Sequence, residues 1–478
     1  MQSTPPLSTP APAGTVRRGS ARGALFAVVT MFFGYMMLEN GLPAAFPTMQ
    51  QALGVSAPAI AWVFTGLMMS NAILTPLTGR LGDIRDKRTV LIGAMVAVAV
   101  GTLLPALAEN VVLLTAGQIL QGAGGGYMAL AVGLLNDTQS PERARMGNGL
   151  LFAAGGVGTV AGLLITGIVL TALPYTSLYW IALAVMLVAI AVAWKSVPAA
   201  PPVKQGRVDW SGAALFAAGL ACVLLGITLA AEHGWSSPPV LGLILGGVAV
   251  LAVFAAVELR IPEPLVELRL LRGRPVLLTC AVAFVAGFGT TALLVSIPML
   301  VALPAATGYG LGGTATLTGL YLLPLGVVAL IAAPLTGRLE RRIGVRWVIA
   351  LSNAAMLAGA LILLAVPHAP WVIAVASGMV GLTIGVGMTQ AMNIVMATVP
   401  AERVASVSAL SLVARSVGGA LGSQITAGLV AGSTIPGTPL PAWDGFASVF
   451  VVLGGIGLVA LLLSLVFPAR LTPRHADA

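Results

Sequence analysis

Residues 76–81 read Pro76-Leu-Thr-Gly-Arg-Leu81, and the same six residues recur as Pro334-Leu-Thr-Gly-Arg-Leu339. Each copy closes a long apolar stretch and opens an arginine-rich connection, Gly79–Arg88 in the first case and Gly337–Arg346 in the second. An identical stretch at matching places in two halves of one chain indicates an internal duplication. It predicts a chain built from a repeated set of apolar segments.

The segments around both copies are long enough to cross a lipid bilayer. Hydrophobic residues make up 58% of the 478 residues and charged residues 8%, whereas a soluble domain has about 25% charged residues. A membrane-spanning helix needs about 20 apolar residues. We predict fourteen spans, at residues 24–46, 58–78, 90–108, 111–135, 147–171, 177–196, 211–231, 238–259, 275–303, 314–335, 347–366, 370–397, 405–431 and 445–467.

Positive charge is confined to alternate connections between these spans. Of the 24 Lys and Arg residues, 23 lie in the tails, in alternate connections or, for Lys195, at the end of a span that leads into one; the last, Arg415, falls well inside a span. Because Lys and Arg in short loops stay cytoplasmic during insertion, both termini are predicted to be cytoplasmic. We expect a multi-pass protein of the bacterial plasma (inner) membrane, since 21 of the 24 cations are Arg, as in GC-rich bacterial genomes.

Polar breaks divide the fourteen spans into groups of six, two and six. The longest break includes Pro198, Pro201 and Pro202, and a second charged segment runs from Arg260 to Arg274. We predict a disordered cytoplasmic tail (1–23), a six-helix bundle (24–197), a cytoplasmic linker (198–210) and two inserted helices (211–259). A cytoplasmic connection (260–274), a second six-helix bundle (275–468) and a cytoplasmic tail (469–478) follow.

The connection Gly79-Arg-Leu-Gly-Asp-Ile-Arg-Asp-Lys-Arg88 is similar to the G-x-L-a-D-r-x-G-r-k loop of the major facilitator superfamily. Gly79, Asp83, Lys87 and Arg88 match that motif, while Asp86 replaces a glycine. The resemblance implies that these four residues form a conformational latch between the two halves. We expect Asp83 to complement the N-terminus of the third span and Gly79 to allow close helix contact.

The fourth and fifth spans carry further resemblance. Gln121, Gly122 and Gly124 match the l-x-x-x-R-x-x-q-G-x-g motif of the family, although Gln118 replaces the buried arginine of that motif. Gly158 and Gly162 stand in the antiporter motif of the fifth span, from which its proline is missing. We expect these two glycines to form a stripe for close helix packing.

The extra pair of spans points to one branch of the family. Val208-Asp-Trp-Ser-Gly212, Glu232-His-Gly-Trp235 and Glu258-Leu-Arg260 resemble the entry, hairpin and exit of the pair inserted in the fourteen-span drug:proton antiporters. The resemblance covers nearly the whole chain. It implies an all-α membrane protein of the major facilitator fold, with two six-helix bundles plus two inserted helices.

Two charged residues inside the spans are the main functional candidates. Glu39 lies in the first span and Arg415 in the thirteenth. Ionisable residues within a membrane are costly and mark proton or substrate paths. Glu39 is predicted to carry a proton or to counter a cationic substrate, and a purely structural carboxyl is the alternative. Further polar candidates for a substrate cavity are Asn40, Gln118, Gln121, Tyr127, Tyr321, Gln390 and Asn393.

The sequence predicts a monomeric transporter that exports amphiphilic drugs or antibiotics by proton antiport and alternating access. A proton-coupled symporter or a uniporter for one metabolite is the first alternative, and a non-transporting sensor or scaffold the second. No nucleophile–base pair, metal-ligand spacing or ATP-binding loop is evident, so neither an enzyme nor a cofactor is expected. The partners we expect are the small-molecule substrate, protons and membrane lipids, with no nucleic acid.

Overall fold

The computed structural model describes residues 21–198, 208–262, 264–366, 369–398, 404–438 and 440–465. Most of the predicted tails and of the 198–210 linker lie outside these residues. Within them the chain is helical and contains no strand, apart from one isolated bridge between Thr434 and Pro441. The all-α prediction is therefore confirmed for the part of the chain that is described.

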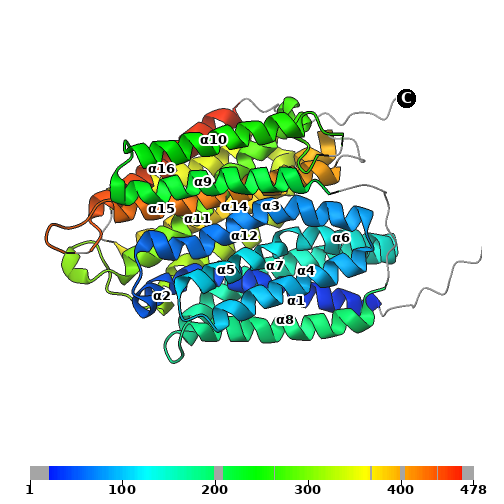
Figure 1. Cartoon of the computed structure of the whole chain (residues 1–478), viewed down its shortest axis with the longest axis horizontal. Helices are drawn as coiled ribbons and strands as arrows, with labels where there is room; N and C mark the ends of the chain where they lie inside the picture. The colour runs from blue at the N-terminus through cyan, green and yellow to red at the C-terminus, as the bar shows by residue number, and fades with distance from the viewer. Residues whose placement is uncertain are drawn as a thin grey trace, which may run out of the picture.

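Three groups of helices follow one another along the chain (Figure 1). The first bundle contains α1 (Ala21–Gly41), η1 (Leu42–Ala45), α2 (Phe46–Leu53), α3 (Ala57–Ile84), α4 (Lys87–Ala106), α5 (Val111–Gln121), η2 (Gly122–Gly126), α6 (Tyr127–Thr138), α7 (Pro141–Val169) and α8 (Thr176–Ser196). The inserted pair is α9 (Trp210–His233) and α10 (Pro238–Glu258). The second bundle contains η3 (Leu268–Arg272), α11 (Arg274–Ala302), η4 (Ala305–Thr307), α12 (Ala315–Ile343), α13 (Val345–Ala365), α14 (Pro370–Thr398), α15 (Val404–Ala431) and α16 (Trp443–Ser464).

Short polar side chains set where several of these helices begin. Asp86, Asn110, Asp209 and Thr314 precede α4, α5, α9 and α12, and each accepts a hydrogen bond from a backbone N–H of the first turn. Such caps satisfy donors that the helix itself leaves free. In the membrane the backbone N–H and C=O groups of the apolar residues that follow have no water to bond. A continuous helix satisfies these groups internally.

Twelve helices of the described chain are long and apolar enough to cross a membrane. Two of the fourteen predicted spans are not among them. The predicted span 111–135 is divided into α5 and α6 by η2, whose sequence is Gly-Ala-Gly-Gly-Gly. The predicted span 405–431 lies in α15, which includes Arg415 and Gln424. The count of fourteen therefore stays a prediction at these two places.

The two bundles meet along two helix pairs. α3 packs against α15, and α7 packs against α12. The inserted helix α9 contacts α10, α15 and α3, while α10 lies at the upper edge of the molecule in Figure 1. α10 is also the least buried span, with 17% of its apolar window buried. We refer below to the end of the molecule that holds α2 as the α2 end, and to the other, where α1 begins, as the Ala21 end.

Candidate functional site

Glu39 is a buried acid near the end of α1. It lies two residues before the end of α1, and 4% of its surface is exposed. Arg415 of α15 acts on it electrostatically, and the Tyr35 hydroxyl is within hydrogen-bonding range of its carboxyl group. The two in-membrane charges singled out from the sequence therefore lie in different bundles and interact electrostatically.

Tyr35 extends this site to a third helix. Its hydroxyl oxygen lies 3.1 Å from Oδ1 of Asn71 on α3. Because a hydroxyl has one proton, Tyr35 donates either to Asn71 or to Glu39. Tyr35 is missing from the residues predicted for the site, although it precedes Glu39 by four positions and so shares its helix face. That spacing is the signal that identifies it.

The glycine run of η2 holds Tyr35 and Asn71 in place. A Cβ atom on Gly124 would lie 2.7 Å from a ring carbon of Tyr35, and one on Gly125 would lie 2.7 Å from Oδ1 of Asn71. Only a residue without a side chain allows this approach. Gly122 to Gly126 thus bring the backbone of η2 against α1 and α3, and this explains why the span is interrupted at this point.

Gln118 and Gln121 point away from Glu39. Gln118 is fully buried and donates to the hydroxyl of Tyr179 on α8, at 3.2 Å. Gln121 donates to Thr102 of α4, at 2.7 Å. The side-chain oxygens of both glutamines are buried without a hydrogen-bond partner. In this conformation both residues join helices within the first bundle.

The other cavity candidates are also occupied by structural contacts. Asn40 donates to the carbonyl of Met36, one turn earlier in α1. Tyr127 donates to the carbonyl of Val28, and Tyr321 packs against the apolar core. Nothing in these contacts brings the three side chains to Glu39, and their role in a cavity stays a prediction.

Gln390 and Asn393 of α14 bind a carboxylate in the repeated connection. Both amide nitrogens donate to Oε2 of Glu340, at 3.3 and 2.9 Å. Glu340 follows directly after the second copy of the six-residue repeat. The two residues therefore tie α14 to the end of α12, at the Ala21 end of the second bundle.

The structure corrects one expectation for the predicted latch, and another stays a prediction. A Cβ on Gly79 would meet open space, whereas one on Gly82 would meet Leu130, so the close helix contact lies at Gly82. Asp83 lies in the last turn of α3, and its side chain is not among those described. The residue that caps α4 is Asp86, whose carboxylate accepts the Thr89 N–H at 3.1 Å.

Two basic residues of the motif hold the first bundle together at the Ala21 end. Arg88 donates to the carbonyl of Trp194, at 2.7 Å, near the C-terminus of α8, where a cation complements the helix dipole. The Lys87 ammonium group lies near Gly133 of α6. The latch between the halves stays a prediction, since these contacts are made within one bundle.

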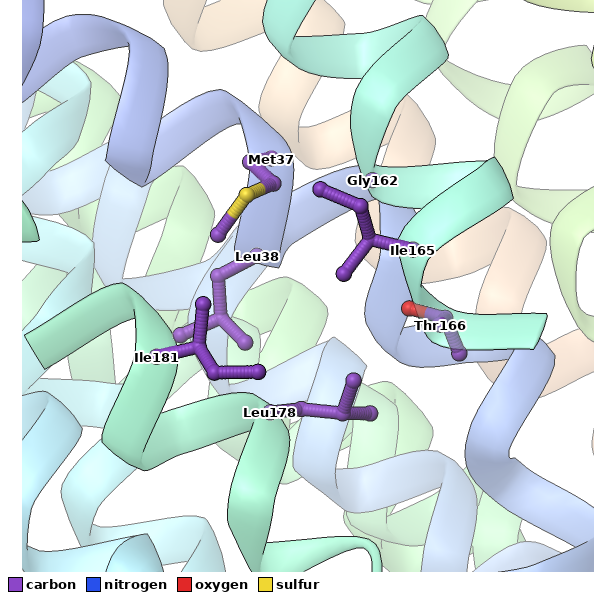
Figure 2. A pocket seen from close by; sticks show the side chains of 7 residues that line it. All are labelled: Met37, Leu38, Gly162, Ile165, Thr166, Leu178 and Ile181. Atoms are coloured by element: carbon purple, nitrogen blue, oxygen red, sulfur yellow. The ribbon is translucent and has the colours of Figure 1, made fainter. Parts of the chain in front are cut away.

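The glycine stripe of α7 is confirmed. A Cβ on Gly158 would lie 2.8 Å from the carbonyl oxygen of Phe33, and one on Gly162 would overlap the carbonyl of Met37. Beside this contact lies a small apolar cavity between α1, α7 and α8 (Figure 2), lined by Met37, Leu38, Gly162, Ile165, Thr166, Leu178 and Ile181. Its volume of about 10 Å³ corresponds to one water molecule. It is too small for a drug-sized ligand.

Contacts between the bundles lie from the α2 end to the middle of the molecule. At the α2 end Thr316 of α12 donates to the carbonyl of Gly167 on α7, at 2.8 Å. Thr65 of α3 donates to Ser423 of α15, at 3.0 Å. Nearer the middle, a Cβ on Gly156 would meet the side chain of Leu330. The bundles are thus closed together at the α2 end.

The inserted helix takes part in this closure. Oγ1 of Thr228 on α9 accepts hydrogen bonds from Nε1 of Trp62 on α3, at 3.0 Å, and from Nε2 of Gln424 on α15, at 2.6 Å. Trp62 belongs to the first bundle and Gln424 to the second. One hydroxyl of the inserted pair therefore connects both bundles at the α2 end.

The sequence profile of the Major Facilitator Superfamily matches residues 24–423, and the chain belongs to this family. Members of this family are membrane transporters and not enzymes. Two solved structures share the fold. The match to the nucleoside transporter NupG covers 93% of this chain and 99% of the NupG chain, with a TM-score of 0.63 and 12% sequence identity. The match to the POT family transporter PepTSo covers 93% of this chain and 97% of the PepTSo chain, with a TM-score of 0.64 and 12% sequence identity.

Several relatives carry names that refer to export or resistance. The cephamycin export protein CmcT of Amycolatopsis lactamdurans is 28% identical over 479 residues, which cover 96% of this chain and 95% of that protein. The tetracenomycin C resistance and export protein of Streptomyces glaucescens is 26% identical, over 87% of this chain and 77% of that protein. An uncharacterized MFS-type transporter of Mycobacterium tuberculosis is 28% identical over 70% of this chain, which spans 48% of that relative's length.

Proposed function

We propose that this transporter exports amphiphilic drugs or antibiotics across the bacterial plasma membrane in exchange for protons. The observation that carries the proposal is Glu39, a buried carboxyl on which Arg415 of the other bundle acts electrostatically. The export and resistance names of relatives that align over most of this chain support the class of substrate. The positive-inside pattern supports placing the Ala21 end in the cytoplasm.

Glu39 has hydrogen-bond partners suited to both of its protonation states. When the carboxyl is ionised, Tyr35 donates its proton to it. When the carboxyl is protonated, it donates to the Tyr35 oxygen, and Tyr35 then donates to Asn71, whose Oδ1 lies 3.1 Å away. The Tyr35 hydroxyl can therefore pair with Glu39 in either protonation state, and it donates to Asn71 when Glu39 is protonated.

Exchange follows if proton and substrate compete for the same carboxylate. In the conformation described here the α2 end is closed. Rocking of the bundles would open that end, and a proton from outside would then release a cationic or polar substrate from Glu39. A drug-sized ligand needs a pocket of about 300 Å³ or more. The cavity beside α1 has room for only about one water molecule, so a site of that size has to form as the bundles move.

A symporter or uniporter for one metabolite is the second candidate function. It is favoured by Gln118, which replaces the arginine of the family motif and donates to Tyr179 instead of Glu39. Without a buried arginine at position 118, Glu39 alone has to couple protons to transport.

A drug-susceptibility panel tests the proposal. A pump-deficient host would express the wild type, Glu39→Gln, or Glu142→Gln as a control that alters an exposed acid of α7. We expect resistance from the wild type and the control, and sensitivity with Glu39→Gln. Equal sensitivity of the host with and without wild-type protein, across cationic dyes and antibiotics, would refute drug export. Equal resistance from all three proteins would remove Glu39 from the mechanism.

A further inference from the structure

Glu258 is a second buried acid, and the transport cycle proposed above does not use it. It ends α10, and 1% of its surface is exposed. Among the described residues, Glu39 and Glu258 are the ionisable carboxyls whose residues are buried. Glu258 lies at the Ala21 end of the inserted pair, whereas Glu39 belongs to α1 of the first bundle.

The carboxyl of Glu258 has one satisfied oxygen and one that lacks a partner. Oε2 accepts the backbone N–H of Val266, at 3.1 Å. Oε1 is buried and has no hydrogen-bond partner. It faces Asp209, whose Oδ2 is likewise buried and unpartnered. A Cβ added to Gly212 would meet both of these oxygens, so they converge on one point.

The two carboxyl groups are close enough to hydrogen-bond each other. Two ionised carboxylates cannot do so, because neither has a proton to donate. Carboxyl groups this close share one proton, since both cannot carry charge side by side away from water. The arrangement therefore requires a proton between Oε1 of Glu258 and Oδ2 of Asp209.

The surroundings indicate which residue carries that proton. Burial raises the pKa of Asp209, but hydrogen bonds from Ser211, from the Gly212 N–H and from Glu258 outweigh it, and the net pKa is lowered. Asp209 also caps α9, a place that favours negative charge. Asp209 is thus the ionised member, and Glu258 is the donor.

Other charges near this junction are engaged elsewhere. Arg269 donates to the carbonyl of Leu259, at 2.7 Å, and Glu267 accepts from Ser406 of α15, at 3.0 Å. Arg260 is exposed. The charged group that acts on Glu258 electrostatically is Asp209. No cation on the described residues therefore replaces the proton in holding the two carboxyls together.

We propose that Asp209 and Glu258 form a second proton-binding site, separate from Glu39, at the base of the inserted pair. The bound proton joins the start of α9 to the end of α10, and through Val266 to the connection that enters the second bundle. Loss of the proton leaves two facing carboxylates and loosens this junction. The inserted pair is thus fixed to the second bundle in a proton-dependent way, whatever the direction of transport.

The sign of the pH dependence follows from proton counting. In the unfolded chain both carboxyls are ionised above about pH 5. The folded protein keeps one additional proton, so its stability falls as rising pH removes that proton. Glu258→Gln and Asp209→Asn each place an amide N–H opposite the remaining carboxyl. Both variants therefore keep the hydrogen bond at any pH and lose the pH dependence.

The test measures thermal unfolding of the full chain in nanodiscs from about pH 5 to about pH 9, with and without added NaCl at constant ionic strength. We expect the melting temperature of the wild type, Glu39→Gln and Glu142→Gln to fall with rising pH, and that of Glu258→Gln and Asp209→Asn to fall measurably less. Infrared spectra at neutral pH should show that Glu258→Gln loses a protonated-carboxyl band that Glu142→Gln retains.

Three outcomes would overturn the proposal. The first is the same pH slope in the wild type and in both pair variants. The second is an unchanged carboxyl band in Glu258→Gln. The third is a rise of the melting temperature with Na⁺ at fixed pH that Glu258→Gln abolishes, because the pair would then bind a metal cation in place of the proton. If Glu258→Gln does not fold, Asp209→Asn provides the same comparison.

Discussion

Replacing Thr228 by valine should favour the conformation that is open at the α2 end. Thr228 accepts one hydrogen bond from Trp62 of the first bundle and one from Gln424 of the second. Opening that end moves these two bundles apart, so at least one of the bonds has to break. Valine has nearly the same shape as threonine and no acceptor. The substitution therefore removes both bonds from the closed state and leaves the packing in place.

The expected magnitude follows from these two bonds. Hydrogen bonds between helices in membranes contribute about 0.6 kcal/mol each on average. If opening breaks one bond the difference is about 0.6 kcal/mol, and if it breaks both it is about 1.2 kcal/mol. The substitution should therefore shift the ratio of open to closed molecules roughly three- to sevenfold, since 1.4 kcal/mol is tenfold. The effect is thus large enough to measure and too small to unfold the protein.

Distances between two spin labels report this shift. Exposed Leu173 of the first bundle and exposed Ala306 of the second lie at the α2 end, and both can be replaced by labelled cysteine once Cys222 and Cys280 are removed. We expect the long-distance population to grow in Thr228→Val. Thr159→Val is the matched control, because the Thr159 hydroxyl bonds Gly155 of its own helix. Equal distributions in wild type and Thr228→Val would refute the role of this hydroxyl.

Two further predictions concern stability. Gly162→Ala should lower the free energy of unfolding by about 1–3 kcal/mol, because a Cβ there overlaps a backbone carbonyl of α1. Gly149→Ala on the same helix places its Cβ in open space and should leave that free energy unchanged. Equal melting temperatures of the two variants would contradict this. Burial and Asp444 raise the pKa of Tyr309, whose hydroxyl donates to the carbonyl of Pro441. The wild type should therefore lose stability as pH rises past about 10, and Tyr309→Phe, about 1 kcal/mol less stable at neutral pH, should lose less.

Much of the architecture could be predicted from the sequence because it depends on local properties. Backbone groups in a membrane favour long apolar helices, and twelve helices of the described chain have the predicted length and apolarity. The stripe of Gly158 and Gly162 was also predictable, since small residues four apart mark close helix contact. The interruption at Gly122–Gly126 was not, because its cause is the approach of Tyr35 and Asn71, two side chains from other helices.

The site was predictable only in part. Glu39 and Arg415 stand out because charges are rare inside apolar spans, and in the fold Arg415 acts electrostatically on Glu39. Gln118 and Gln390 are further candidates from the sequence, yet their partners, Tyr179 and Glu340, lie far away in the sequence. A polar residue in a span can face a cavity or a neighbouring helix, and only the packing decides which. Partners of this kind require the structure.

The central claim is that Glu39 exchanges protons for an exported substrate. Purified protein in liposomes that contain a pH-sensitive dye tests it most directly, when a cationic substrate is added on the side exposed to the Ala21 end. The account predicts that substrate and protons move in opposite directions in the wild type, and that Glu39→Gln abolishes the proton movement. Proton movement in the same direction as the substrate, or an undiminished proton signal in Glu39→Gln, would contradict it.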